Sequence, residues 1–399
     1  MQKIIDIHSH PSLKTYLYDI DLTKRNKSAK DFDIFNSDYV QTDIPKMTEG
    51  GLNAAVVAHY LPEIGFLKYC KLIRSVRCLL EAFLKQFVEK VEKETSPEAP
   101  FVQTLKILKK FEEKAAASPN AVIPKSYQEL TDALQDNKRI FIHAVEGGHS
   151  LGRKLGTTDK YLENLQTLYD AGVCMLTIAH FFENDLAACL DGMPPSIINL
   201  LGCKRPTNSK PGLSKTGEAV VEFMLDKGMV VDLTHCTFDA RKRVYEINKK
   251  REKQGKSLRP LVFSHAGVRT KYNNRMNPSV HEIQKIKECE GVIGVIFMNY
   301  WLTGREEEDL LGIDIFEDKG VEYIVDTIKE IKHIAGSYDN IAIGTDFDGF
   351  TDPPDNLQDC SKMPKLIERL NKIEGINQDD IDKITYKNAL RVLEKGWGK

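Results

Sequence analysis

The hydrophobic residues of this chain recur in short, nearly continuous runs. Each run has about five to eight residues, is often rich in β-branched side chains and ends in a polar cluster, which is typical of strands buried on both faces of a parallel sheet. The pattern predicts strands at residues 3–10, 53–60, 139–147, 173–181, 229–236, 260–267, 292–299 and 340–349.

Amphipathic stretches between these runs predict helices. Residues 215–227 have helical apolar spacing and are followed by Gly228, a residue type that often ends helices. Residues 126–136 begin with a serine and carry Glu129 three positions later, which is a capping-box pattern. Residues 320–335 also have helical spacing. Strand and helix therefore alternate, which predicts an α/β fold with a (β/α)8 TIM-like barrel. A doubly wound sheet would give the same alternation.

The longest section between predicted strands covers residues 61–138, between the second and third strands. Apolar spacing predicts one long helix over 66–94 and another over 101–117. We expect this section to be a helical insertion packed on the barrel, with a partner-binding or dimer-forming hairpin as the alternative. The strand count favours a single domain over residues 1–399, although this length also suits two ordinary domains.

Composition excludes several classes of protein. Lys plus Arg (56) nearly cancels Asp plus Glu (58), which argues against a nucleic-acid or anionic-membrane partner. The N-terminus has no secretory signal pattern, and the longest apolar run, 291–302, is well short of the roughly 20 residues that span a bilayer. The eight cysteines include no C-x-x-C pair. We therefore expect a cytoplasmic protein with reduced thiols.

Residues capable of metal binding or proton transfer gather at the ends of the predicted strands. They are His8, His10, His59, Glu146, His180, His235, His265, Asn299 and Asp346. Barrel enzymes build their active sites at the C-terminal ends of the strands. A barrel would therefore bring these side chains to one mouth, which the doubly wound alternative does not predict.

Five of these residues predict a metal centre. Residues i and i+2 of a strand share a face, so His8 and His10 would both point into the barrel mouth. With His235, His265 and Glu146 they form a set of imidazoles and one carboxylate that suits zinc better than calcium or magnesium. Five ligands exceed one tetrahedral site, and a carboxylate can bridge two ions. We expect two ions, one on each histidine pair, bridged by the carboxylate and by a hydroxide that attacks the substrate.

Asp346 ends the last predicted strand, in Gly-Thr-Asp-Phe-Asp-Gly. Its carboxylate could accept a proton from the attacking water and pass it to the leaving group. The alternative is a structural residue of the turn. The expected ions are zinc, with manganese or iron as alternatives.

Several of these residues lie in longer motifs. In chain order the motifs are Val-Glu-Gly-Gly-His-Ser-Leu at 145–151, Gly-Leu-Ser-Lys-Thr-Gly at 212–217, Gly-Met-Val-Val-Asp-Leu-Thr-His at 228–235, Phe-Ser-His at 263–265, Ile-Gly-Thr-Asp-Phe-Asp-Gly at 343–349 and Asn-Ala-Leu-Arg-Val at 388–392. Together they resemble the membrane (renal-type) dipeptidase family of amidohydrolase-like metal-dependent hydrolases.

The resemblance implies a TIM-like barrel with a binuclear zinc centre, a small peptide substrate and a homodimer. It implies that Glu146 bridges the ions and that His235 and His265 bind the second one. His180 would polarise the scissile carbonyl or its oxyanion, with a structural core histidine as the alternative. Asp346 matches the acid/base aspartate of the family.

The chain departs from the family at the first strand, which ends His8-Ser9-His10 where the family usually has His-x-Asp. A neutral ligand in place of a carboxylate makes the site one charge unit more positive. This change should make a bound water more acidic and hold the metal less tightly by charge alone.

The chain also departs from the family around the substrate. The family has two arginines where this chain has Arg275 and Met276, so binding of a substrate carboxylate by Arg275 is an expectation, with Arg269 or Lys271 as alternatives. The family tends to have Asn-Phe-Tyr where this chain has Asn-Tyr-Trp at 299–301. The expected substrate-binding residues are His180, Arg275, Asn299 and Tyr300.

The sequence thus predicts a zinc-dependent, dipeptidase-like hydrolase. The first alternative is the same metal centre acting on a lactone, a cyclic amide or a modified amino acid. A binding or scaffold protein is disfavoured, because all five expected ligands are chemically competent.

Overall fold

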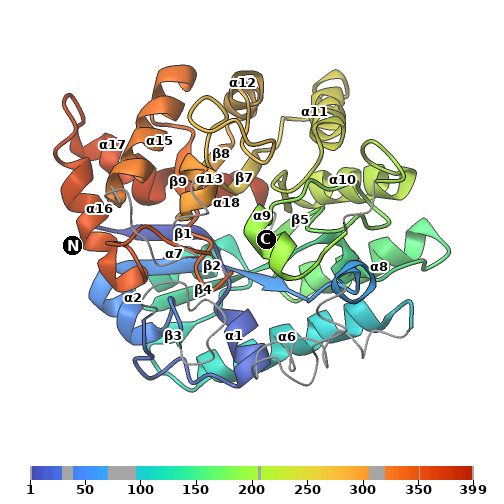
Figure 1. Ribbon diagram of the computed structural model, residues 1–399, viewed down its shortest axis with the longest axis horizontal. Helices are drawn as coiled ribbons and strands as arrows, with labels where there is room; N and C mark the ends of the chain where they lie inside the picture. Colours follow the sequence, from blue (N-terminus) through green and yellow to red (C-terminus); the bar gives the residue numbers. More distant parts are fainter. Residues whose placement is uncertain are drawn as a thin grey trace.

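The computed structural model describes residues 2–28, 39–70, 96–204, 208–304, 320–349 and 351–397. Its strands form one parallel sheet in the order β2-β1-β9-β8-β7-β6-β5-β4-β3, and β2 also pairs with β4. That pairing closes every strand except the short β3 into a barrel, which helices surround (Figure 1). The predicted (β/α)8 TIM-like barrel is confirmed.

Each predicted strand segment contains one observed strand, and β3 is an addition. The strands are β1 Ile4–Ser9, β2 Leu52–Tyr60, β3 Ala121–Val122, β4 Arg139–Glu146, β5 Met175–Thr177, β6 Val230–Asp232, β7 Leu261–Ala266, β8 Val292–Val295 and β9 Ile341–Ile343. Several are shorter than predicted, because their polar C-terminal residues leave the ladder. Those residues form the loops at the barrel mouth.

Helices follow most of the strands. They are α1 Pro11–Tyr18, α2 Ile44–Gly50, α3 Gly65–Tyr69, α6 Ala99–Ala116, α7 Tyr127–Gln135, α8 Thr158–Asp170, α9 Pro195–Leu200, α10 Lys215–Lys227, α11 Phe238–Lys253, α12 Val280–Glu288, α13 Asn299–Thr303, α15 Val321–Ala335, α16 Met363–Leu370, α17 Gln378–Asp382 and α18 Asn388–Gly396. Short 3-10 helices lie at Gly148–Leu151 and Cys360–Lys362, and a π-helical turn at Lys383–Lys387.

The predicted helix ends are largely present. Gly228 ends α10 with a φ of 75°, and its N–H donates to the carbonyl of Met224. Ser126 caps α7 by accepting the N–H of Glu129. The Glu129 carboxylate instead accepts the N–H of Lys125, so the reciprocal half of the predicted capping box is missing.

The barrel interior is a packed apolar core and not a channel. Ile7, Ile142 and Val262 belong to one buried cluster with Leu393 and Trp397 at the C-terminal end of the chain. A second cluster packs the outer face of the strands against the surrounding helices. The polar site therefore lies at the mouth, above a filled barrel, as in other barrels of this kind.

The predicted insertion contains α3, α6, β3 and α7 between β2 and β4. Helix α6 packs against α1 and the barrel through buried side chains such as Ile107 and Phe111. Helix α3 ends at Tyr69, where Cys70 takes an extended conformation. Residues 71–95, which carry most of the long helix predicted over 66–94, lie outside the described residues.

The expectation of reduced thiols is wrong for one pair, because Cys70 and Cys203 form a disulfide. The two residues are 133 positions apart but lie in an antiparallel bridge with Cα atoms 3.8 Å apart. No spacing pattern in the sequence predicts this pair. The other cysteines within the described ranges are free and buried. None of the helices in those ranges is both long and apolar enough to cross a bilayer.

Candidate metal centre

His8 and His10 meet at the mouth by an irregular route. β1 carries a register shift between Asp6 and Ser9, and the strand ends at Ser9, so His10 lies just beyond it as the residue before α1. The strand predicted over 3–10 therefore ends one residue before His10. The two Nε2 atoms are nevertheless 3.0 Å apart, and both rings are buried.

Glu146, the last residue of β4, lies at the centre of the cluster and is 2% exposed. Its Oε1 lies 3.4 Å from Nε2 of His8, 3.5 Å from that of His235 and 3.7 Å from that of His265. Its Oε2 lies 3.4 Å from Nε2 of His10. The second histidine pair also converges, with 3.2 Å between the Nε2 atoms of His235 and His265. The structure thus brings the five predicted ligands together around one carboxylate.

Two residues of the site have left-handed backbone conformations. His235 has a φ of 65° and Asp346 a φ of 60°, values that non-glycine residues rarely adopt. Both positions follow a strand at a sharp turn, and the turn aims the side chain at the cluster. Asp346 Oδ1 lies 3.1 Å from Nε2 of His10, and the N–H of Asp346 donates to the carbonyl of His8. Such strain is common where a site imposes the backbone geometry.

Ser264 orients two of the imidazoles from behind. Its hydroxyl donates to Oδ2 of Asp232 at 2.6 Å, and its oxygen lies 2.8 Å from Nδ1 of His8 and 3.0 Å from Nδ1 of His265. Because the hydroxyl proton points to Asp232, each Nδ1 donates to the serine oxygen. In the neutral form of each ring, Nε2 then carries the lone pair that a metal needs.

The charges of the cluster depend on each other. Burial would raise the pKa of Glu146, but the imidazoles of His180, His8 and His10 hold it well below its usual range. Burial would lower the pKa of His8, but the carboxylates of Glu146 and Asp346 raise it to about 9. The pKa of His235 is lowered by burial and by His180. Glu146 therefore remains a carboxylate at neutral pH.

The geometry fits bound metal ions. Ligand atoms of a tetrahedral zinc site with bonds of 2.0–2.1 Å lie about 3.3 Å apart, close to the separations around Glu146. Oε1 of Glu146 is buried and has no hydrogen-bond partner among the described residues. Ligand atoms of His8, His10 and Asp346, and of Glu146, His180 and His235, form groups close enough to hold an ion. The donor set and the orphaned oxygen therefore agree with a metal centre.

His180 and Asn299 lie at the same mouth. His180 is buried beyond the end of β5, with Nε2 3.3 Å from Oε2 of Glu146 and its ring 4.4 Å from that of His235. Asn299 begins α13 and is 7% exposed, and its Oδ1 is buried without a hydrogen-bond partner within the described ranges. Tyr300 is half-buried, with its ring 5.9 Å from that of Tyr272.

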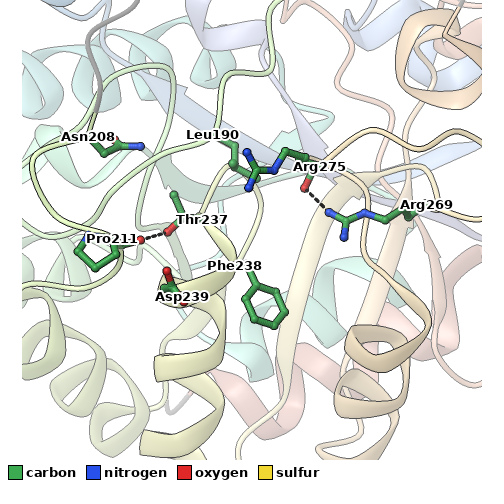
Figure 2. Close-up of a pocket in the computed structure, with 8 residues that line it drawn as sticks. All are labelled: Leu190, Asn208, Pro211, Thr237, Phe238, Asp239, Arg269 and Arg275. Carbon is green, nitrogen blue, oxygen red and sulfur yellow. Dashed lines mark hydrogen bonds between the residues drawn. The ribbon is translucent and has the colours of Figure 1, made fainter.

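Arg275 lies apart from the cluster. It is exposed and lines a pocket of ≈ 220 Å³ between the loops that follow β5, β6 and β7. Figure 2 shows Arg275 and Arg269 across this pocket from Asn208 and Pro211. Arg269 donates to the carbonyl of Arg275, and within the described part of the chain no contact links the Arg275 guanidinium to a metal-centre residue. The next residue, Met276, is fully buried.

His59 does not belong to the site, although it is near the end of a strand. The register of β2 and β4 pairs His59 with Val145 and Tyr60 with Glu146, so Tyr60 shares the face of Glu146 and His59 has the opposite one. His59 instead contacts Nδ1 of His143 at 2.7 Å, against α6. Sequence reasoning chose the histidine for its chemistry and missed the tyrosine, whose ring lies 4.5 Å from that of His180.

Glu63 is a second residue that the sequence analysis missed. It follows β2 by three positions, is buried, and its carboxylate contacts His180. It belongs to no motif of the site, and its partner is 117 positions away. No signal in a single sequence links the two residues.

Comparisons with known proteins show what the chain is similar to. A sequence model of the membrane dipeptidases, peptidase family M19, matches residues 1–396. An uncharacterized dipeptidase of Schizosaccharomyces pombe is 30% identical over 229 residues, which cover 57% of this chain and 48% of that protein. Dipeptidase tcpJ of Claviceps purpurea is 26% identical over 277 residues, covering 67% of this chain and 55% of that protein. The chain spans about half the length of these curated relatives.

A solved structure is also similar. It is the metallo peptidase from Rhodobacter sphaeroides liganded with a phosphinate mimic of the dipeptide L-Ala-D-Ala. The two folds agree with a TM-score of 0.72 over 99% of each chain, at 17% sequence identity. At that identity the likeness shows the shared fold alone.

Proposed function

Because this chain belongs to the membrane dipeptidase family, we propose that it is a metal-dependent hydrolase that cleaves a dipeptide or another small amide. The observation that carries the proposal is the convergence of four imidazoles on the buried carboxylate of Glu146. An ordinary protein interior does not gather four imidazoles around one buried acid without a ligand for their nitrogens.

The proposed centre holds two zinc-like ions. His8 and His10 would hold one, His235 and His265 the other, and Glu146 would contact both. When bound, such ions polarise a substrate carbonyl and lower the pKa of water. Manganese or iron would suit the same donor set.

Asp346 and His180 supply the proposed acid–base and oxyanion chemistry. The Asp346 carboxylate lies beside His10, with Oδ1 3.1 Å from Nε2 of that histidine. It would accept a proton from the attacking water and deliver it to the leaving amine. With a proton on Nε2, His180 would donate a hydrogen bond to the carbonyl oxygen while negative charge develops on it.

We propose that the substrate is a small dipeptide. The similar Rhodobacter structure binds a dipeptide mimic, and this chain keeps the fold that supports that site. Asn299 offers a buried amide oxygen with no hydrogen-bond partner among the residues that the structure describes, which suits a donor on the substrate. Tyr300, the next residue, would form part of the wall of the substrate site. Arg275 would reach the substrate carboxylate only if the loop after β7 brings it inward.

The structure also favours a second candidate, a lactone, a cyclic amide or a modified amino acid without a free carboxylate. Met276 is buried, and Arg275 lines the separate pocket of Figure 2, so the described residues show no arginine at the metal cluster. A substrate without a carboxylate would need no arginine at the metal cluster.

A substrate panel tests both candidates on the zinc-loaded chain. The panel contains free dipeptides with L- and D-residues at the second position, the same dipeptides with a blocked C-terminus, and lactones. Preferred cleavage of free dipeptides supports the first candidate, and preferred cleavage of blocked dipeptides or lactones supports the second. Glu146→Ala should remove nearly all activity. Metal-replete protein that cleaves no amide, ester or lactone would contradict the proposal.

A further inference from the structure

We propose that Glu63 is the positioning residue for His180, an inference that rests on the proposed function. Oε1 of Glu63 lies 2.8 Å from Nδ1 of His180, and both side chains are 5% exposed. Glu63 follows β2 and His180 follows β5, so the contact joins two loops of the mouth. Glu63 has no place in the metal centre itself.

The carboxylate holds the backbone beside His180 as well as its ring. Oε1 accepts the N–H of Phe181 at 3.0 Å, and Oε2 accepts the N–H of Phe182 at 3.1 Å. One buried side chain therefore fixes the imidazole and the two peptide groups after it. With these three donors satisfied, the ring has little freedom to turn about its χ angles.

The contact also determines which nitrogen of His180 faces the site. An ionised carboxylate only accepts hydrogen bonds, so the imidazole must donate from Nδ1. The other nitrogen, Nε2, then points to Oε2 of Glu146 at 3.3 Å. Nε2 is therefore the ring nitrogen of His180 that faces Glu146 and the expected position of the substrate oxygen.

Packing gives the loop a firm support. The ring of Phe66 lies 5.1 Å from that of Phe182, and the ring of Tyr69 stacks on Phe182 at 5.7 Å. Both aromatic residues belong to α3, which begins directly after the Glu63 segment. The geometry therefore places Glu63 and its neighbours as one unit behind His180.

Glu63→Gln tests the inference. Glutamine keeps the size and one acceptor oxygen but cannot serve all three donors. With the dipeptide that the zinc-loaded protein hydrolyses fastest, we expect kcat to fall about 10- to 100-fold, as is common for hydrogen-bond partners behind site histidines. KM and zinc content should stay nearly unchanged. If this variant does not fold, Glu63→Asp, which keeps the charge, should give an intermediate loss.

A double variant separates positioning from general stability. If Glu63 acts through His180, Glu63→Gln should have no further effect on kcat in a His180→Asn background. If the two losses multiply, the proposal is wrong. Glu183→Gln is the matched control, because Glu183 lies three residues after His180 but holds Ser209 and Lys210 instead. Its kcat should match that of the unmodified protein.

A spectroscopic measurement tests the inference without any activity. In ¹⁵N NMR of histidine-labelled, zinc-loaded protein, the His180 signal is identified by its absence in His180→Asn. The proposal requires a proton on Nδ1, and Glu63→Gln should change that state. An unprotonated Nδ1 in the unmodified protein would overturn the inference. If the same protein nevertheless hydrolysed dipeptides normally, the inference about Glu63 would be wrong and the proposed function would still hold.

Discussion

At the residue scale, the side chains that hydrogen-bond to the candidate ligands matter as much as the ligands, because they orient the imidazole rings. Ser264 touches Nδ1 of both His8 and His265, and it is anchored by the buried carboxylate of Asp232. Asp232 in turn accepts two threonine hydroxyls, from Thr177 and Thr234. This chain of hydrogen bonds holds both rings with Nε2 toward the carboxylate of Glu146, and such hydrogen-bond partners orient the ligands of a metal site.

Ser264→Ala should therefore weaken metal binding while leaving the fold intact. Without the serine oxygen, both Nδ1 groups lose their acceptor and each ring is free to take the other tautomer. We expect zinc affinity to fall about 10- to 100-fold, measured by competition with a chelator. Ser126→Ala is the control, because Ser126 caps α7 away from the centre. It should change stability and not zinc affinity, and an equal loss of affinity in both variants would contradict the account.

The sequence could predict the residues that the structure brings together around Glu146, but not the side chains that support them. His235 and Glu146 lie in motifs at strand ends, where chemistry and position coincide. Glu63 acts through a partner 117 positions away. Ser264 is next to His265 in the sequence, but it also contacts His8, 256 positions away, and only the closed barrel brings these distant pairs together. The contact of each residue depends on the register of the strands, which a single sequence does not fix.

At the element scale, the face of a strand residue decides its role. His59 and His143 lie on neighbouring strands β2 and β4 and face α6, not the mouth. Burial lowers the pKa of His59 well below its usual value, and burial lowers that of His143 although Glu112 opposes the shift. Both imidazoles are therefore neutral in the folded protein at neutral pH.

This pair should make the protein less stable in mild acid. A histidine whose folded pKa lies below its unfolded value near 6.5 contributes full stability above pH 6.5 and loses it as the pH falls. Each excluded proton costs about 1.4 kcal/mol per pH unit in that window. We expect urea unfolding between pH 6.5 and 5.5 to show a steeper loss for the unmodified protein than for His59→Gln/His143→Gln. Parallel pH dependences would contradict this reading.

Strand positions were predictable, whereas strand ends were not. The apolar runs mark all eight barrel strands, because strands covered on both faces need continuous apolar sequence. β1, however, contains a register shift and ends at Ser9. His10 therefore reaches the mouth from the position between β1 and α1. β5 and β6 are short because their polar ends bend into site loops. Such bends depend on contacts across the barrel mouth.

At the scale of the whole molecule, the barrel brings residues from both ends of the chain to one site. His8 lies near the N-terminus, and Asp346 pairs with it through the backbone after β9. The Cys70–Cys203 disulfide adds a second long-range link, between α3 and the loop before α10. That link lies beside the segment that carries Glu63, so it supports the mouth and not the barrel floor.

Loss of this disulfide should loosen the molecule measurably. Removing a disulfide that closes a long loop typically costs about 2–4 kcal/mol. We expect Cys203→Ser to lower the melting temperature, and a reductant to lower it in the unmodified protein but not in the variant. A melting temperature that is insensitive to reductant in both proteins would show that the bond contributes nothing. Free and buried Cys289 offers a control substitution outside the pair.

We propose that the cluster around Glu146 holds two metal ions. The most direct test is to measure the metal content of the zinc-supplemented, dialysed protein by elemental mass spectrometry. The account predicts about two ions per chain, because five ligands exceed the capacity of one tetrahedral site. A content below about half an ion per chain would contradict it, since the buried imidazoles would then have to be satisfied in another way.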